Sequence, residues 1–149
     1  MINIILIIAL FYFPLINVGY INITPDFLLL LIIVNVQHLN DYKALFLGLF
    51  IGLIQDFLTQ DNYFGLIAIF SILISYFLLK IKSYKSIKFY ELSIFLLILL
   101  YSFLKYTIMY DETYYFYLQF SLIQSIITYS VLFLIKTTFK ERFGKFGKV

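Results

Sequence analysis

Long apolar runs separated by short polar turns dominate the chain. A helix needs roughly 20 mostly apolar residues to cross a bilayer, with a range of ~17–25. The pattern predicts an all-α integral membrane protein folded as a six-helix transmembrane bundle. The approximate helical segments are 3–20, 25–38, 42–57, 63–80, 90–109 and 113–135.

Proline positions limit the first two segments. Pro14 kinks the first helix or ends it early, because proline lacks an N–H donor and clashes with the preceding turn. Pro25 opens the second segment, with Thr24 as the expected cap and Asp26 favourably placed at the positive end of the helix dipole. The second and third segments are both short for a span. They are either two short crossings or a re-entrant hairpin, and both alternatives stay open.

The composition excludes a soluble domain. The 149 residues are 63% hydrophobic and 13% charged, against ~45–50% and ~25% in soluble domains. The 18 Phe and 14 Tyr argue against disorder, and the lack of cysteine excludes a disulfide scaffold. We therefore expect one polytopic membrane domain over 1–135 and a basic cytoplasmic tail over 136–149.

The basic residues set the expected orientation. If the amino terminus lies inside, ten of the eleven Lys and Arg residues fall in inner turns or in the tail, and none falls in an outer loop. Positively charged loops stay on the cytoplasmic side, so we expect both termini in the cytoplasm. The net charge of +3 is then a consequence of topology, and nothing else in the chain supports nucleic-acid binding.

Small residues recur every four positions in the third segment. Ala44, Gly48, Gly52 and Asp56 lie on one stripe of a helix, and small residues let two helix backbones approach closely. The stripe predicts packing inside the bundle, with a partner-docking face as the alternative.

Two charged residues in the segments need partners, because charge in hydrocarbon is costly. Asp56 lies near the outer interface, which favours a structural cap or an ion pair over a proton relay. Lys105 lies at a similar depth, and we expect it to pair with Asp56. Asp111 and Glu112 are alternative partners, and snorkelling to the interface is the alternative to pairing.

The residues suggest no reactive site. His38, the only histidine, lies in a polar turn without further metal ligands at suitable spacing. No cysteine nucleophile, carboxylate pair within a span or phosphate-binding glycine loop is present, so we expect no enzyme, cofactor or metal. A polar stripe on the last segment predicts hydrogen bonds inside the bundle, with a substrate pathway as the alternative. Its members are Gln119, Ser121, Gln124, Ser125 and Thr128.

Three sequence blocks occur in a characteristic order. A Pro-Asp pair opens the Leu-rich second segment, a Gly-xxx-Gly-xxx-Asp pattern fills the third, and a Gly-Leu pair opens the fourth. Their residues are Pro25, Asp26, Gly48, Gly52, Asp56 and Gly65. In this order and spacing the chain resembles the rod-shape-determining membrane protein MreD family over about residues 24–80. Tyr63 departs from the proline that many members carry there, which leaves the shape of that outer loop open.

The resemblance implies a non-enzymatic scaffold of the bacterial cell-elongation complex in the cytoplasmic (inner) membrane. MreD-like proteins bind the bitopic protein MreC. Through it they connect the MreB filament to the peptidoglycan glycosyltransferase and transpeptidase, and so help maintain rod shape. The family is also similar to the six-helix substrate-binding subunits of energy-coupling-factor transporters. A subunit that binds a vitamin-like molecule is therefore the alternative, although the first segment has only Ala9 where such subunits carry repeated docking alanines.

Overall fold

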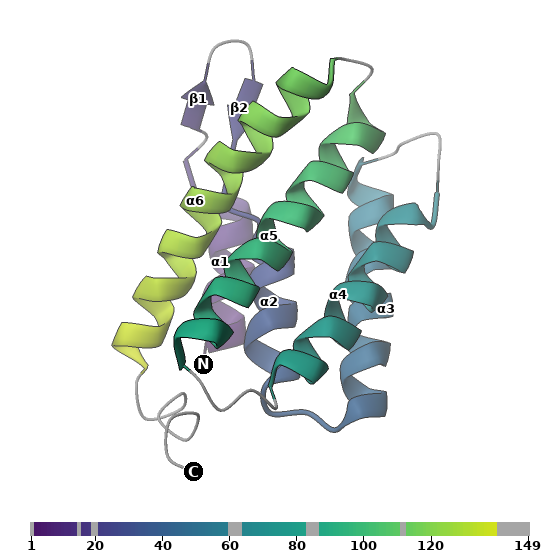
Figure 1. Ribbon diagram of the computed structural model, residues 1–149, viewed down its shortest axis with the longest axis vertical. Helices are drawn as coiled ribbons and strands as arrows, with labels where there is room; N and C mark the ends of the chain where they lie inside the picture. The colour runs from purple at the N-terminus through teal and green to yellow at the C-terminus, as the bar shows by residue number, and fades with distance from the viewer. Residues whose placement is uncertain are drawn as a thin grey trace.

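The computed structural model describes residues 2–14, 16–18, 21–59, 64–82, 87–110 and 113–139, and these are mostly helical (Figure 1). The helices of this part are α1 (Ile2–Tyr12), α2 (Phe27–Val36), α3 (Asp41–Thr59), α4 (Leu66–Ile81), α5 (Ile87–Met109) and α6 (Tyr114–Thr138). The predicted helical fold class is confirmed. The short strands β1 (Ile16–Val18) and β2 (Ile21–Ile23) pair antiparallel between α1 and α2, which the sequence pattern did not predict.

Three of the described helices are long and apolar enough to cross a membrane, namely α3, α5 from Phe89 onwards, and α6. The helices α1, α2 and α4 are apolar but shorter. At 1.5 Å per residue, the ten residues of α2 extend ~15 Å, about half of a ~30 Å hydrocarbon core. The third segment, which the sequence pattern predicts to be short for a span, is the span-length helix α3. The described chain thus combines three span-length helices with three shorter ones, and a bundle of six spans is not confirmed.

Helix α1 ends well before the predicted limit of residue 20. Its last backbone hydrogen bond runs from Phe13 N to Ala9 O at 2.9 Å, one residue before Pro14. Because proline disfavours the helical conformation of the residue before it, the chain leaves the helix there. The hairpin then carries the chain to α2, with Ile16 opposite Ile23 and Val18 opposite Ile21.

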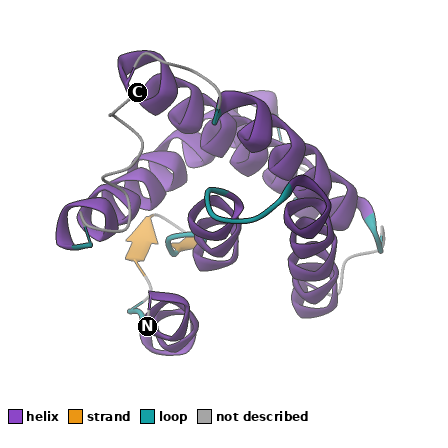
Figure 2. Cartoon of the chain, turned by 90° about the horizontal axis from the view of Figure 1, so that it is seen from below, coloured by secondary structure: helices purple, strands orange, loops and turns teal. Residues whose placement is uncertain are grey.

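Helix α2 lies at the centre of the bundle, with the other helices around it (Figure 2). It contacts α1, α3, α4 and α6. All of its residues except Asn35 are buried, as expected for a helix that is apolar on every side. Asn35 exchanges two amide hydrogen bonds with Asn3 of α1, at 2.9 and 3.1 Å, which satisfies both polar side chains in an apolar setting.

The glycine stripe of α3 packs directly against α4. A Cβ atom at Gly52 would overlap the Cα of Ala68 and lie 2.9 Å from the Cβ of Ser71. A Cβ atom at Gly48 would lie 2.8 Å from the carbonyl oxygen of Ser71. Ala44 is fully buried as well. The stripe is therefore an internal contact, and α4 occupies the face that a partner helix would need.

The basic side chains of the described part gather mostly at one end of the bundle. This is the end where α1 begins, α3 begins, and α4 and α6 finish (Figure 1). Lys105 is the exception, inside α5. The residues at that end are Lys43, Lys80, Lys82 and Lys136. The side chains of the other basic residues, including the whole tail from residue 140, lie outside the described residues.

Replacing Gly52 by Leu should prevent α3 from packing on α4, because the new side chain occupies the position of the α4 backbone. Overpacking of this kind costs about 1–3 kcal/mol or more. We expect a clearly lower melting temperature in detergent, or loss of folded protein. Phe50→Leu, on the exposed side of the same helix, is the control and should melt like the wild type. A wild-type melting curve for Gly52→Leu would contradict this packing.

Candidate functional site

Asp26, immediately before α2, is a buried carboxylate with several partners. Its Oδ1 accepts a hydrogen bond from Leu29 N at 3.0 Å, so Asp26 is the N-cap of the helix. Its Oδ2 lies 2.8 Å from Lys105 Nζ of α5. The side chains are 3% exposed for Asp26 and 17% for Lys105. Each charge thus has the compensation that a buried ion requires.

This geometry corrects two expectations. The cap of α2 is Asp26 and not Thr24. Lys105 pairs with Asp26, 79 residues away in sequence, and not with Asp56. Helix α2 lies at the centre of the bundle, so its first turn reaches the inner face of α5, whereas the carboxylate of Asp56 is engaged by α4. The alternative partners, residues 111 and 112, lie outside the described residues.

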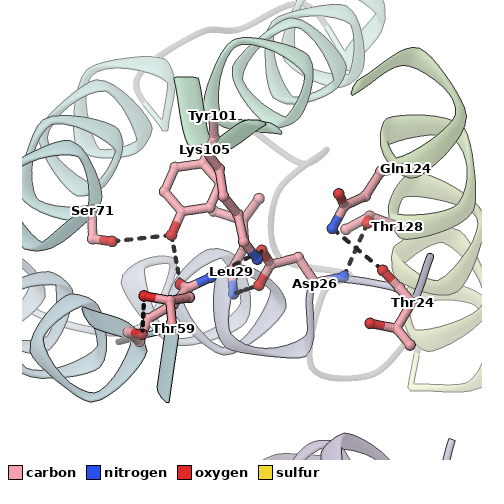
Figure 3. Close-up of polar contacts among 10 residues, drawn as sticks. Thr24, Asp26, Leu29, Thr59, Ser71, Tyr101, Lys105, Gln124 and Thr128 are labelled. Atoms are coloured by element: carbon pink, nitrogen blue, oxygen red, sulfur yellow. Dashed lines mark hydrogen bonds and ion pairs between the residues drawn. The ribbon is translucent and has the colours of Figure 1, made fainter. Parts of the chain in front are cut away.

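Gln55 extends the ion pair into a hydrogen-bond network, and Figure 3 labels Asp26, Lys105, Tyr101 and Ser71 in it. Its Nε2 donates to Asp26 Oδ2 at 3.3 Å, and its Oε1 accepts from the Tyr101 hydroxyl at 2.6 Å. The Tyr101 hydroxyl also lies 3.4 Å from Ser71 Oγ of α4. All of these side chains except Lys105 are buried. The network therefore links the start of α2 to α3, α4 and α5.

Helix α6 joins the same region from the other side. Asp26 N donates to Thr128 Oγ1 at 3.1 Å, and Gln124 Nε2 donates to the carbonyl oxygen of Thr24 at 3.3 Å. These contacts match the predicted role of the polar stripe, hydrogen bonding inside the bundle. The remaining stripe residues are Gln119, which is exposed, and Ser121 and Ser125, which donate to carbonyl groups of α6 itself.

Asp56 caps α4 from the neighbouring helix. Its two carboxylate oxygens accept from Ile67 N at 3.2 Å and from Ala68 N at 3.0 Å. Amide groups in the first turn of a helix have no partner within that helix, and a carboxylate there also matches the dipole. Gly65, just before α4, has φ +97°, a left-handed conformation in which glycine avoids the strain of a Cβ atom. These hydrogen bonds match a structural cap, which was one of the expected roles of Asp56.

Gln55 and Tyr101 are central to the network but were not among the predicted site residues. Polar side chains inside membrane helices usually bond to neighbouring helices, so their residue type is the available signal. That signal is weak here, since Gln55 ends an apolar run and Tyr101 is one of 14 tyrosines.

A cavity of about 150 Å³ lies beside the ion pair. Lys105, Gln55 and Gln124 supply polar groups to its wall, and Leu10 and Leu58 supply apolar ones. Its volume is below the ~300–1,000 Å³ of typical small-molecule sites, and equals about five waters at ~30 Å³ each. Among the described residues no group of three or more His, Cys, Asp or Glu is placed to hold a metal ion. His38 is exposed in the turn after α2.

A second ion pair joins α5 and α6 at the opposite end. Lys136 Nζ lies 2.9 Å from both carboxylate oxygens of Glu91, and the Tyr129 hydroxyl donates to Glu91 at 3.1 Å. The Lys136 ammonium also lies 5.1 Å from the ring centroid of Tyr90, whose hydroxyl accepts from Gln37 Nε2. The sequence pattern did not predict this cluster of side chains. It ties the end of α2 to the two long helices.

Lys105→Met should destabilise the fold, because the Asp26 carboxylate would remain buried without its cation. Breaking a buried ion pair costs about 3–5 kcal/mol, and the partial exposure of Lys105 places the loss at or below the lower end. Adding Asp26→Asn should restore part of the melting temperature, since the uncompensated charge is then removed. Melting curves in detergent measure both effects.

Lys136→Met is the matched control for this experiment. Its partner Glu91 is 34% exposed and stays hydrated, so the loss should be smaller. If Lys105→Met melts like the wild type, or the double variant melts no higher than Lys105→Met alone, the buried pair does not stabilise the bundle.

Comparisons with known proteins add no family to this description. No protein-family model, no curated protein and no solved structure matches the chain.

Proposed function

We propose that the chain is a non-enzymatic, MreD-like membrane scaffold that binds a bitopic MreC-like protein in the bacterial cytoplasmic membrane. The proposal rests on the structural roles of the motif residues. Asp26 starts the central helix, Gly48 and Gly52 pack α3 on α4, and Asp56 caps α4. Motif residues used in this way hold the helices together, which is what a scaffold requires.

The surface proposed for the partner is α1. The glycine stripe, the docking face considered from the sequence, is covered by α4, so the exposed side of α1 is proposed instead. Helix α1 packs on α2 at the edge of the bundle (Figure 2). Ile4, Ile8 and Phe11 follow one another at helical spacing and are 52–75% exposed. A single transmembrane helix can pack along this row by dispersion contact.

In this proposal the basic end of the bundle faces the cytoplasm, where the MreB filament lies. Four lysines of the described part gather at that end, and positively charged ends remain on the cytoplasmic side. The partner then connects the scaffold to the peptidoglycan glycosyltransferase and transpeptidase outside. The protein contributes to rod shape by holding these components together.

A substrate-binding transporter subunit is the second candidate. The observation in its favour is the convergence of a carboxylate, an ammonium and two amides on the cavity at the ion pair. That cavity of about 150 Å³ is small for a vitamin-like ligand, because sites for such molecules occupy ~300–1,000 Å³. The scaffold therefore ranks first.

Co-purification in mild detergent tests the scaffold directly. The tagged chain should retain an MreC-like single-span protein from the same cells, and its depletion should round rod-shaped cells. The Ile8→Ala, Phe11→Ala double variant should retain several-fold less partner while it accumulates and melts like the wild type. Phe133→Ala on α6 is the control, since Phe133 is exposed to a similar extent but lies on another helix.

Two results would speak against the scaffold. One is normal cell shape after depletion together with no co-purified MreC-like protein. The other is a vitamin-like molecule that stays bound through purification and is identified by mass spectrometry, which would support the transporter subunit instead.

A further inference from the structure

A larger cavity lies at the basic end of the bundle, away from the ion pair. It has a volume of about 480 Å³ and is formed between the first turn of α3 and the last turn of α4. Helix α3 is long and apolar enough to cross a membrane, and in a membrane-spanning α3 its first turn, which lines this cavity, lies at the headgroup level. Its lining residues are Asp41, Tyr42, Leu45, Tyr76, Leu79 and Lys80.

Two opposite charges face this cavity from different helices. Asp41 belongs to α3 and Lys80 to α4. The Lys80 ammonium lies 5.6 Å from the ring centroid of Tyr76. No hydrogen bond or ion pair joins the Asp41 carboxylate to another residue in the part of the chain that is described. The cavity therefore offers a cation on one wall and an available anion on the other.

The rest of the lining is amphipathic. Leu45 and Leu79 supply apolar walls, and Tyr42 is 89% exposed. Tyrosine rings are typical of the headgroup level of a membrane, where one end of the ring is apolar and the other meets water. Pockets with basic residues between membrane helices are typical sites for lipid headgroups.

We propose that this cavity binds a phospholipid with a phosphoethanolamine headgroup. Lys80 interacts with the phosphate, and Asp41 accepts hydrogen bonds from the primary ammonium. Leu45 and Leu79 contact the glycerol and the first methylene groups of the acyl chains. The volume of about 480 Å³ lies within the usual range of ~300–1,000 Å³ for small-molecule sites.

The charge pattern separates this lipid from the other common ones. An anionic phosphatidylglycerol has no ammonium, so its phosphate would face both Lys80 and the repelling carboxylate of Asp41. A phosphatidylcholine carries a positive charge but has no N–H group, so it cannot donate a hydrogen bond to Asp41. The site therefore favours a headgroup that has both a phosphate and an N–H donor.

The chain contains no tryptophan, so a single substitution creates a local fluorescent reporter. A Tyr42→Trp variant is reconstituted into phosphatidylcholine vesicles that hold a minor fraction of one brominated lipid. The lipids carry bromine close to the glycerol and differ only in the headgroup, which is phosphoethanolamine, phosphocholine or phosphoglycerol. Bromine quenches tryptophan on contact, so quenching reports which lipid occupies the cavity.

We expect the phosphoethanolamine lipid to quench the Tyr42→Trp reporter several-fold more than either of the other two lipids. Tyr115→Trp is the matched control reporter. Tyr115 is 77% exposed in the first turn of α6, at the opposite end of the bundle and away from the cavity. The three lipids should quench that reporter equally.

Charge variants in the Tyr42→Trp background test the two contacts. Asp41→Asn should reduce quenching by the phosphoethanolamine lipid to the level of phosphocholine, and Lys80→Gln should weaken it too. Lys82→Gln, which does not line the cavity, should leave the preference intact. Asp41, Lys80 and Lys82 are exposed, so these variants should fold, and their melting curves check this.

Three results would overturn the proposal. They are equal quenching of the Tyr42→Trp reporter by all three lipids, stronger quenching by the phosphoglycerol lipid, and an unchanged preference in Asp41→Asn. The second would identify a site for an anionic lipid instead. The vesicles hold no partner protein, so the outcome is independent of the proposed scaffold function.

Discussion

The central helix α2 depends on the polar contacts at its start. Its first turn is buried, and buried N–H groups need a hydrogen-bond partner. Asp26 meets this need by capping the helix, and its charge is in turn balanced by Lys105 and by the amide of Gln55. Because these partners come from α3 and α5, one side chain sets the position of the buried helix against two of the longest ones.

Other helices of the bundle are also joined by close packing, by a carboxylate cap and by an ion pair. Helices α3 and α4 approach closely over glycine, and Asp56 closes the contact by capping α4. At the basic end, Glu91 and Lys136 join α5 to α6. The contacts of Asp26 and Asp56 satisfy polar groups that are buried, whereas Glu91 is 34% exposed and links α5 to α6 where water reaches it. A bundle held together in this way suits a protein proposed to hold other components in place.

The two cavities differ in what they can accept. The one at the ion pair is small, and its charged groups already bond to one another, so it serves the fold more readily than a ligand. The one between α3 and α4 is larger, and its opposite charges lie on separate helices. The first polar cluster is therefore structural, and the second is the one proposed to bind a lipid headgroup.

Local sequence patterns are sufficient for the helical class and the glycine stripe, because apolar runs and four-residue spacing act through local geometry. Pro14 predicts either a kink or an early end of the first helix, and the structure has the early end. The sequence also indicates how deep a residue lies in the bundle, since its position along a helix gives its distance from the helix ends. It does not indicate which helices are neighbours. The pairing of Lys105 with Asp26 and the capping of α4 by Asp56 depend on the tertiary arrangement, because both acids lie near the same depth and the packing around α2 selects between them.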